Sequence, residues 1–191
     1  MRAHFSILCN QEKRTCADNM SSIYHEKQRS QLCAVHAINN LFQDGLLCSK
    51  NKLDKLCLQL DPSVLMNQHR SMFGTGNYDI NVIMVFLNDQ GYDVIWFDKR
   101  KTLNEINIDE IVGFLVNTLS SYKVFGRSIN LFLFKHWYAI RSLNGIYFNL
   151  DSKLQSPMKI GDRDSVLKYL NEIINEGHNE LLIVVKKGSV A

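Results

Sequence analysis

The chain has 191 residues, 46% of them apolar and 21% charged, which is enough for one domain with a substantial core and is unlike the composition of a disordered chain. The 22 basic and 19 acidic residues give a net charge of only +3, and the largest basic cluster is the short DKRK at 98–101, which argues against a nucleic-acid-binding protein. No apolar run approaches the roughly 18 residues of a membrane span, and the apolar stretch at 5–8 is too short for a signal peptide.

The five cysteines are odd in number and none forms a CxxC pair, which excludes the disulfide framework of a small secreted protein. We therefore expect free thiols and a cytoplasmic location. Residues 1–21 show no clear periodicity and predict a flexible N-terminal extension. The domain itself is expected to span 22–186, with a short C-terminal tail at 187–191.

The first half of the domain is predicted to be mainly helical. The segment SQLCAVHAINNLFQDG at 30–45 indicates an amphipathic helix, with Ser30 as its N-cap and Gly45 as its C-terminal stop. A second helix is expected over about 50–60, where helical spacing of the apolar residues places Cys57 in the core.

The middle of the chain gives a mixed pattern. Asp79 can cap a third helix over about 80–90, and a strand is expected at 93–97. Residues 108–117 predict another helix, and 121–130 predict a loop. The pattern therefore places helices on both sides of a single strand.

Strand signals are strongest in the second half. LFLFKHWYAIR and GIYFNLD are rich in aromatic and branched residues, and the SLNG between them contains an Asn-Gly pair that favours a tight hairpin. An amphipathic helix around 166–174 and a strand at 180–186 follow. Because helices cluster before strands, this order predicts an α+β domain rather than alternating βαβ units.

Cys33 is a candidate nucleophile because it is the third residue after the expected Ser30 cap. Unpaired N–H groups and the positive end of the helix dipole favour a thiolate there, although a small core residue is the alternative. His36 has no evident group to orient its ring, so we interpret it as helix packing. A zinc site built from Cys33, His36 and His25 would lack a fourth ligand.

His136 is the better candidate for a base, because a strand holds its ring in a fixed direction. A two-residue turn at 144–145 would place His136 on the same face as Asp151, its diagonal neighbour, with Asn149 one step farther away. Diagonal neighbours lie about 7–8 Å apart, within reach of a carboxylate and an imidazole. A surface salt bridge is the alternative to a catalytic pair.

A nucleophile, a base and an orienting group would then be complete in Cys33, His136 and Asp151. Gln28, just before the helix, could direct its amide at the oxyanion that forms when a thiolate attacks a carbonyl. Trp137 either walls a narrow substrate groove or is a buried core aromatic.

Several stretches resemble a known family. IYHEKQRSQLCAVHAINNLFQ, HWYAIR and YFNLDSK are similar to the Josephin domain of cysteine-type deubiquitinases, in particular the small Josephin-1 and Josephin-2 type, and GTGNYDINVIM and WFDKR extend the likeness over roughly 22–186. The resemblance implies a papain-like cysteine-protease fold, with a helical part and an antiparallel sheet. It also implies hydrolysis of isopeptide or peptide bonds after the C-terminal glycine of ubiquitin, through a thioester.

Carried over by this resemblance, Gln28 matches the family's oxyanion-hole glutamine, Cys33 its nucleophile and His136 its general base. Asp151 occupies the third catalytic position, where the long Josephin proteins have asparagine. We expect ubiquitin and ubiquitinated proteins as partners, a monomer, and no cofactor or metal. Two alternatives stay open: a ubiquitin-binding module with little turnover, and another papain-like thiol hydrolase or acyltransferase.

Overall fold

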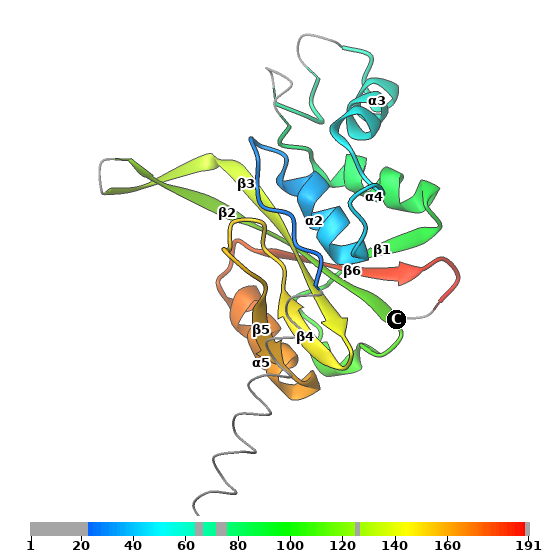
Figure 1. Cartoon of the computed structure of the whole chain (residues 1–191), viewed down its shortest axis with the longest axis vertical. Helices are drawn as coiled ribbons and strands as arrows, with labels where there is room; N and C mark the ends of the chain where they lie inside the picture. Colours follow the sequence, from blue (N-terminus) through cyan, green and yellow to red (C-terminus); the bar gives the residue numbers. More distant parts are fainter. Residues whose placement is uncertain (1–22, 64–66, 72–75, 125–126, 190–191) are drawn as a thin grey trace, which may run out of the picture.

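The structure is a computed structural model that describes residues 23–63, 67–71, 76–124 and 127–189. The predicted N-terminal extension at 1–21 lies outside the described residues. In sequence, three helices precede all the strands of a six-stranded sheet, and a fourth helix precedes its last strand (Figure 1). The predicted α+β class is confirmed.

The sheet is antiparallel and has the strand order β1-β6-β2-β3-β4-β5. Its strands are Tyr92–Trp96 (β1), Ile111–Val124 (β2), Arg127–Leu143 (β3), Ile146–Asn149 (β4), Met158–Gly161 (β5) and Glu180–Lys186 (β6). The long hairpin of β2 and β3 extends beyond the other strands (Figure 1). In the strand order, β2 and β3 are the two central strands, and over most of the domain both of their faces are covered.

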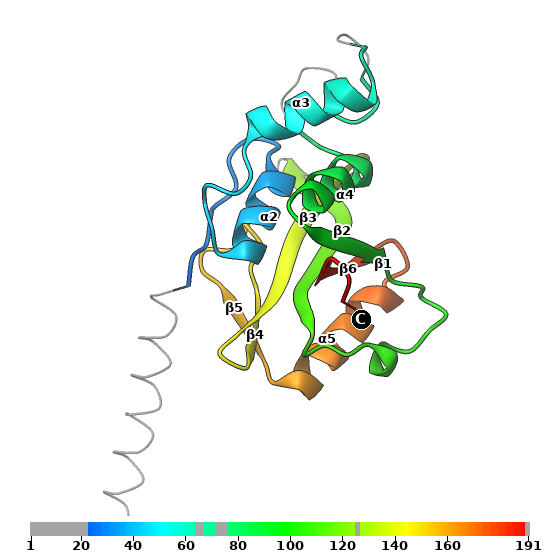
Figure 2. The same ribbon diagram turned by 90° about the vertical axis from the view of Figure 1, so that its right-hand side faces the viewer.

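Helices cover both faces of this sheet. They are Cys33–Phe42 (α2), Lys50–Leu60 (α3), Ile80–Asp89 (α4) and Arg163–Asn175 (α5), with a short 3₁₀ turn at Leu103–Glu105. α2 and α4 pack on one face and α5 on the other, while α3 lies beyond α4, away from the sheet (Figures 1 and 2). None of the helices in the described ranges has the length and apolar character that crossing a bilayer requires.

Alternation of side chains along the central strands divides the core into two parts. Leu115 and Trp137 pack with α2 and α4, whereas Phe114 and Tyr138 pack with α5. His136 alternates with Trp137 in the same way, so its ring emerges on the α5 side of the sheet. The side chains of His136 and Trp137 therefore point to opposite faces of the sheet.

The predicted hairpin is confirmed. Its turn consists of two residues, and β3 pairs with β4 from Leu143↔Ile146 to Ile140↔Asn149. Asn144 and Gly145 take positive φ angles of 54° and 78°, as a tight turn between twisted strands requires. The register on which the His136 and Asp151 pairing was based is thus the observed one.

The predicted helix at 108–117 is wrong, and so is the predicted loop at 121–130. Residues 111–124 form β2, and β3 begins at Arg127. β2 lies in the middle of the sheet with both faces covered, so its IVGFLV reads as a continuous apolar run without the alternation of a half-exposed strand. Such a run cannot be distinguished from a buried helix by periodicity.

The predicted N-cap of α2 is also wrong. The helix begins at Cys33 with Leu32 as N-cap, and Ser30 lies before it with a φ of 53°. Gln31 forms a bridge to the 76–77 segment, where its carbonyl accepts a hydrogen bond of 2.8 Å from Asn77. This pairing holds Gln31 outside the helix, and Leu32, with a φ of −93° and a ψ of 25°, makes the turn into it.

The helix also ends earlier than predicted, at Phe42 rather than next to Gly45. Gln43 takes a left-handed φ of 57°. Its side-chain amide pairs with the backbone of Tyr24, accepting from the N–H at 2.9 Å and donating to the carbonyl at 3.0 Å. α2 therefore ends where the N-terminal segment is attached to it.

Candidate active site

Cys33 is the first residue of α2 and is only 4% exposed. Helix geometry leaves the N–H groups of its first turn without intrahelical acceptors, and the positive end of the helix dipole lies at the same point. The helix cannot easily shift, because Ala34, Ile38 and Leu41 are fully buried against the sheet. The thiol is thus held at a place that favours negative charge on sulfur or on an attacked oxygen.

His136 and Asp151 form a hydrogen-bonded pair. Nε2 of the ring lies 2.7 Å from Oδ1 of Asp151, and the ring is 3% exposed. Asn149 is not the partner of the ring: its amide donates to the Tyr169 hydroxyl at 2.9 Å and accepts from the Asp151 N–H at 2.8 Å. The asparagine supports the carboxylate, and the carboxylate orients the imidazole.

The Cys33 side chain lies close enough to this ring to act on its pKa. Because Asp151 takes Nε2, Nδ1 is the nitrogen left for sulfur. Burial alone would lower the pKa of His136, but the hydrogen bonds and charges of Asp151 and Cys33 outweigh it and raise this pKa above 6.5.

The carboxylate shifts in the complementary direction. Burial would raise the pKa of Asp151, but the hydrogen bond and charge of His136, together with Lys153, lower it below 3.8. Each partner of the pair therefore favours the charged form of the other.

Gln28 is bonded both to the segment that follows Asp151 and to the segment that leads into α2. Its backbone N–H donates to the Ser152 carbonyl at 2.8 Å, and its side-chain Nε2 donates to the Ser30 carbonyl at 3.1 Å. A primary amide nitrogen has two hydrogens, so one fixes the side chain and the second stays available for an oxyanion.

A strap, defined as residues 23–29, runs beside α2 and carries Gln28 (Figure 1, dark blue). Glu26 of the strap accepts hydrogen bonds from the Tyr24 hydroxyl, from Nδ1 of His36 and from the Asn39 amide. The Arg29 N–H donates to Nε2 of His36 at 3.2 Å. This arrangement assigns the Nδ1–H tautomer to His36 and occupies both of its ring nitrogens.

The same strap is tied to the segment that carries Asp151. Asn40 of α2 accepts from the Glu26 N–H at 2.6 Å and donates to the Leu150 carbonyl at 2.9 Å. His25 bonds through Nε2 to the Asp151 carbonyl at 2.9 Å. The segments that carry the thiol, the amide and the carboxylate are thereby joined through buried polar groups.

The interpretation of His36 as helix packing needs one correction. A group that orients its ring does exist, namely Glu26, ten residues earlier in the chain. The sequence offered one signal for it: His36, Asn39 and Asn40 lie at i, i+3 and i+4, which places three polar residues on one buried stripe of a helix.

Comparison with known proteins gives a single family. The Josephin family model matches residues 28–185. This chain belongs to the Josephin family.

Relatives of the small Josephin type match over most of their length. Mouse Josephin-2 is 43% identical over 166 residues, which is 87% of each chain. A Josephin-like protein from Drosophila melanogaster is 42% identical, covering 85% of this chain and 73% of its own. Human ataxin-3 is 30% identical over 90% of this chain but only 47% of its own length. The predicted likeness to the small Josephin type, and with it the Josephin fold, is confirmed.

Trp137 of this Josephin domain is 4% exposed, and its indole N–H donates to the Tyr78 carbonyl at 3.0 Å. It packs in the core below α2 and α4, and it also lines a cavity of about 400 Å³ with residues from α4, β1, β2 and β6. Both interpretations of Trp137 thus have structural support, and its contact with substrate stays a prediction.

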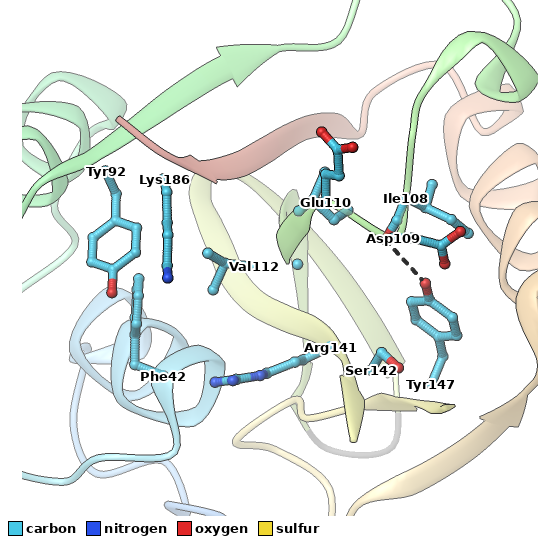
Figure 3. A pocket seen from close by; sticks show the side chains of 12 residues that line it. Phe42, Tyr92, Ile108, Asp109, Glu110, Val112, Arg141, Ser142, Tyr147 and Lys186 are labelled. Carbon is cyan, nitrogen blue, oxygen red and sulfur yellow. Dashed lines mark hydrogen bonds between the residues drawn. The ribbon is translucent and has the colours of Figure 1, made fainter. Parts of the chain in front are cut away.

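Another cavity of the domain lies away from these residues. It measures about 600 Å³ and opens between the end of α2, β1 and the central strands, with Arg141 and Lys186 pointing into it (Figure 3). Arg141 donates to the Leu41 carbonyl at 2.5 Å, near the end of α2. None of the predicted site residues lines this cavity, so its size does not make it the catalytic site.

The zinc alternative gains no support from the coordinates. Across the described ranges, no three His, Cys, Asp or Glu side chains are grouped as metal ligands. The ring nitrogens of His36 bond to the strap, and His25 bonds to the Asp151 carbonyl. The side chains proposed for zinc are thus engaged in other hydrogen bonds.

Proposed function

We propose that this protein is a cysteine-type deubiquitinase that hydrolyses isopeptide or peptide bonds after the C-terminal glycine of ubiquitin. One observation carries the proposal: the buried ring of His136 is hydrogen-bonded to the Asp151 carboxylate and has the Cys33 side chain near enough to act on its pKa. Membership of the Josephin family supports ubiquitin as the substrate.

In the first half of the reaction, Cys33 reacts as the thiolate and His136 as the imidazolium. The sulfur forms a bond to the glycine carbonyl carbon, and the carbonyl electron pair moves onto oxygen. The Cys33 N–H and the free N–H of Gln28 stabilise this oxyanion. When the tetrahedral intermediate collapses, His136 gives its proton to the leaving lysine amine, and a thioester remains.

In the second half, water replaces the amine. The water oxygen bonds to the thioester carbon while His136 takes a proton from the water. The carbon–sulfur bond then breaks and returns the thiolate. Asp151 keeps the ring oriented and stabilises its positive charge in both halves. Every proton that moves passes through His136.

Ubiquitin with a C-terminal electrophile tests the proposal. The probe should form a covalent adduct with the wild-type protein and none with Cys33→Ala. Cys57→Ala is the matched control, because burial raises the pKa of Cys57 to about 11 and keeps this thiol protonated. An adduct that persists in Cys33→Ala would contradict the assignment of the nucleophile.

A ubiquitin-binding module with little turnover is the second candidate. It is favoured by the closed state of the site, where Cys33 is only 4% exposed and one Gln28 N–H is used by Ser30. Such a protein would bind ubiquitin yet release no fluorophore from a ubiquitin coumarin amide. A cytoplasmic location and a monomeric state are part of the main proposal and rest on the sequence.

A further inference from the structure

Asn117 lies in the middle of β2 and is 2% exposed. Neither its amide nitrogen nor its amide oxygen has a hydrogen-bond partner within the part of the chain that the structure describes. Burying an amide in this state is unfavourable, because it loses the bonds that water would make. By contrast, the buried Asn179 donates to the Ile173 carbonyl at 2.9 Å and to the Glu176 carboxylate at 3.0 Å.

The position of Asn117 relates it to the active site. It is paired directly with Trp137 across β2 and β3, and the next pair along the ladder is Thr118 with His136. Directly opposite residues share a face of the sheet, with Cβ atoms about 5 Å apart. Asn117 therefore lies beside Trp137, on the face of the sheet opposite to His136. Asn77 lines the same cavity and donates to the Gln31 carbonyl at 2.8 Å, two residues before Cys33.

Asn117 and Trp137 both line the cavity of about 400 Å³. Trp96 at its border is 51% exposed, so the cavity opens to solvent. A buried, unpartnered amide in the wall of an open cavity is placed to bind a ligand that supplies both an acceptor and a donor.

We propose that Asn117 binds an extended stretch of the substrate's main chain in this cavity, beside the segment that leads into α2. Its Nδ2 donates to a peptide carbonyl and its Oδ1 accepts from a peptide N–H, which is the complementary pair that a main chain presents. This inference rests on the proposed deubiquitinase function and adds a subsite to it. Trp137 forms the apolar wall beside that main chain.

The charges around the cavity favour a neutral ligand over an ion. Glu180 accepts from the Trp96 indole at 2.8 Å, Asp79 lies 2.8 Å from His69, and Arg70 lies 3.3 Å from Asp54. These charged residues are thus engaged with protein partners, and Lys135, the other charged lining residue, is exposed to solvent. The amide group of Asn117 is the deep polar group left for the ligand.

The Asn117→Leu substitution tests the inference, because leucine has a similar volume and no polar atoms. We expect an unchanged or higher melting temperature, since an unsatisfied amide is removed, together with a kcat/KM that falls about tenfold to a hundredfold. Asn179→Leu is the matched control: it should lower the melting temperature and leave kcat/KM unchanged below that temperature. Unchanged kcat/KM in Asn117→Leu would overturn the inference.

Two substrates identify which main chain is bound. A ubiquitin coumarin amide lacks a polypeptide after the scissile bond, whereas di-ubiquitin has one. Loss of kcat/KM on both substrates assigns the subsite to the ubiquitin tail, and loss on di-ubiquitin alone assigns it to the chain beyond the bond. Loss on neither contradicts the subsite.

The proposed function can fail separately from this inference. If wild type neither reacts with the electrophilic probe nor cleaves ubiquitin substrates, the deubiquitinase proposal is wrong. The subsite is then read from the dissociation constant of ubiquitin with Cys33→Ala and with Cys33→Ala/Asn117→Leu. Weaker binding by the double variant supports the subsite, and equal binding overturns it.

Discussion

Nε2 of His136 lies 2.7 Å from Oδ1 of Asp151, although the paired ladder of their two strands ends at Asn149. The carboxylate is held by its own turn, because Oδ1 also accepts from the Lys153 N–H at 2.8 Å. Its orientation is thus fixed before any proton moves. A pre-oriented charge needs no reorganisation during the reaction.

Asp151→Asn should move the alkaline limb of the activity profile to lower pH. His136 must be protonated to donate to the leaving amine, and Asp151 helps to raise the pKa of this ring. Removing the charge therefore makes the ring lose its proton at lower pH. The measurement is kcat/KM against pH for a ubiquitin coumarin amide, and an alkaline limb that stays in place would contradict this role of Asp151.

The same pair should make folding stability depend on pH within a defined window. The raised pKa of His136 contributes stability that is complete below 6.5 and is lost as pH rises through the folded-state value. The lowered pKa of Asp151 contributes stability that is present above 3.8 and is lost as pH falls through the folded-state value. The difference in unfolding free energy between wild type and Asp151→Asn, from urea titrations, should therefore be largest between these limits. A difference that is constant with pH would argue against the coupling.

Gln28→Ala should reduce kcat by about a hundredfold to a thousandfold, the usual effect of losing an oxyanion donor, with a smaller change in KM. The free N–H of this amide acts on charge that develops only during the reaction. Gln59→Ala, on the exposed side of α3, is the control and should keep full activity. A change confined to KM would indicate ordinary binding instead.

Glu26→Gln should destabilise the domain by about 1–3 kcal/mol, because it leaves a buried polar group unpaired. If the new amide nitrogen faces His36, it meets the Nδ1 hydrogen; if His36 changes tautomer, its Nε2 hydrogen meets the Arg29 N–H. One bond is lost in either case. Urea unfolding measures the effect, and the exposed Lys27→Ala in the same strap should change stability by less than about 0.5 kcal/mol.

Gly113→Ala should destabilise the domain more than Gly91→Ala. A Cβ at Gly113 would lie 2.6 Å from the Ile140 carbonyl oxygen and 2.8 Å from Leu41, at the bulge between β2 and β6. Gly91 also has a positive φ, but a Cβ there meets nothing within 4 Å. The overpacking at Gly113 should add about 1–3 kcal/mol, measured as the difference between the two variants in urea unfolding.

The hairpin shows how far sequence reasoning reached. An Asn-Gly turn fixes the register of two strands locally, so the shared face of His136 and Asp151 followed from the sequence. Cys33 at a helix start followed equally from local pattern, although its cap did not. Local rules suffice where a turn or a helix end determines the geometry.

Other features depend on distant parts of the chain. β2 was mistaken for a helix because only its neighbours in the sheet decide that both of its faces are covered. The bond between Glu26 and His36 joins two separate segments, and nothing in either segment specifies the other. That the Asn117 amide has no hydrogen-bond partner among the described residues can be seen only in the folded structure.

The attachment of the strap to α2 has a practical meaning for experiments. Glu26 and Arg29 bond to His36, Asn39 and Asn40, and Gln28 lies between them in the chain. A purification tag or fluorescent label fused directly ahead of Ile23 would pull on the backbone that positions this amide. Handles for immobilisation belong at the other terminus, where force is transmitted first to β6 and not to the reacting groups.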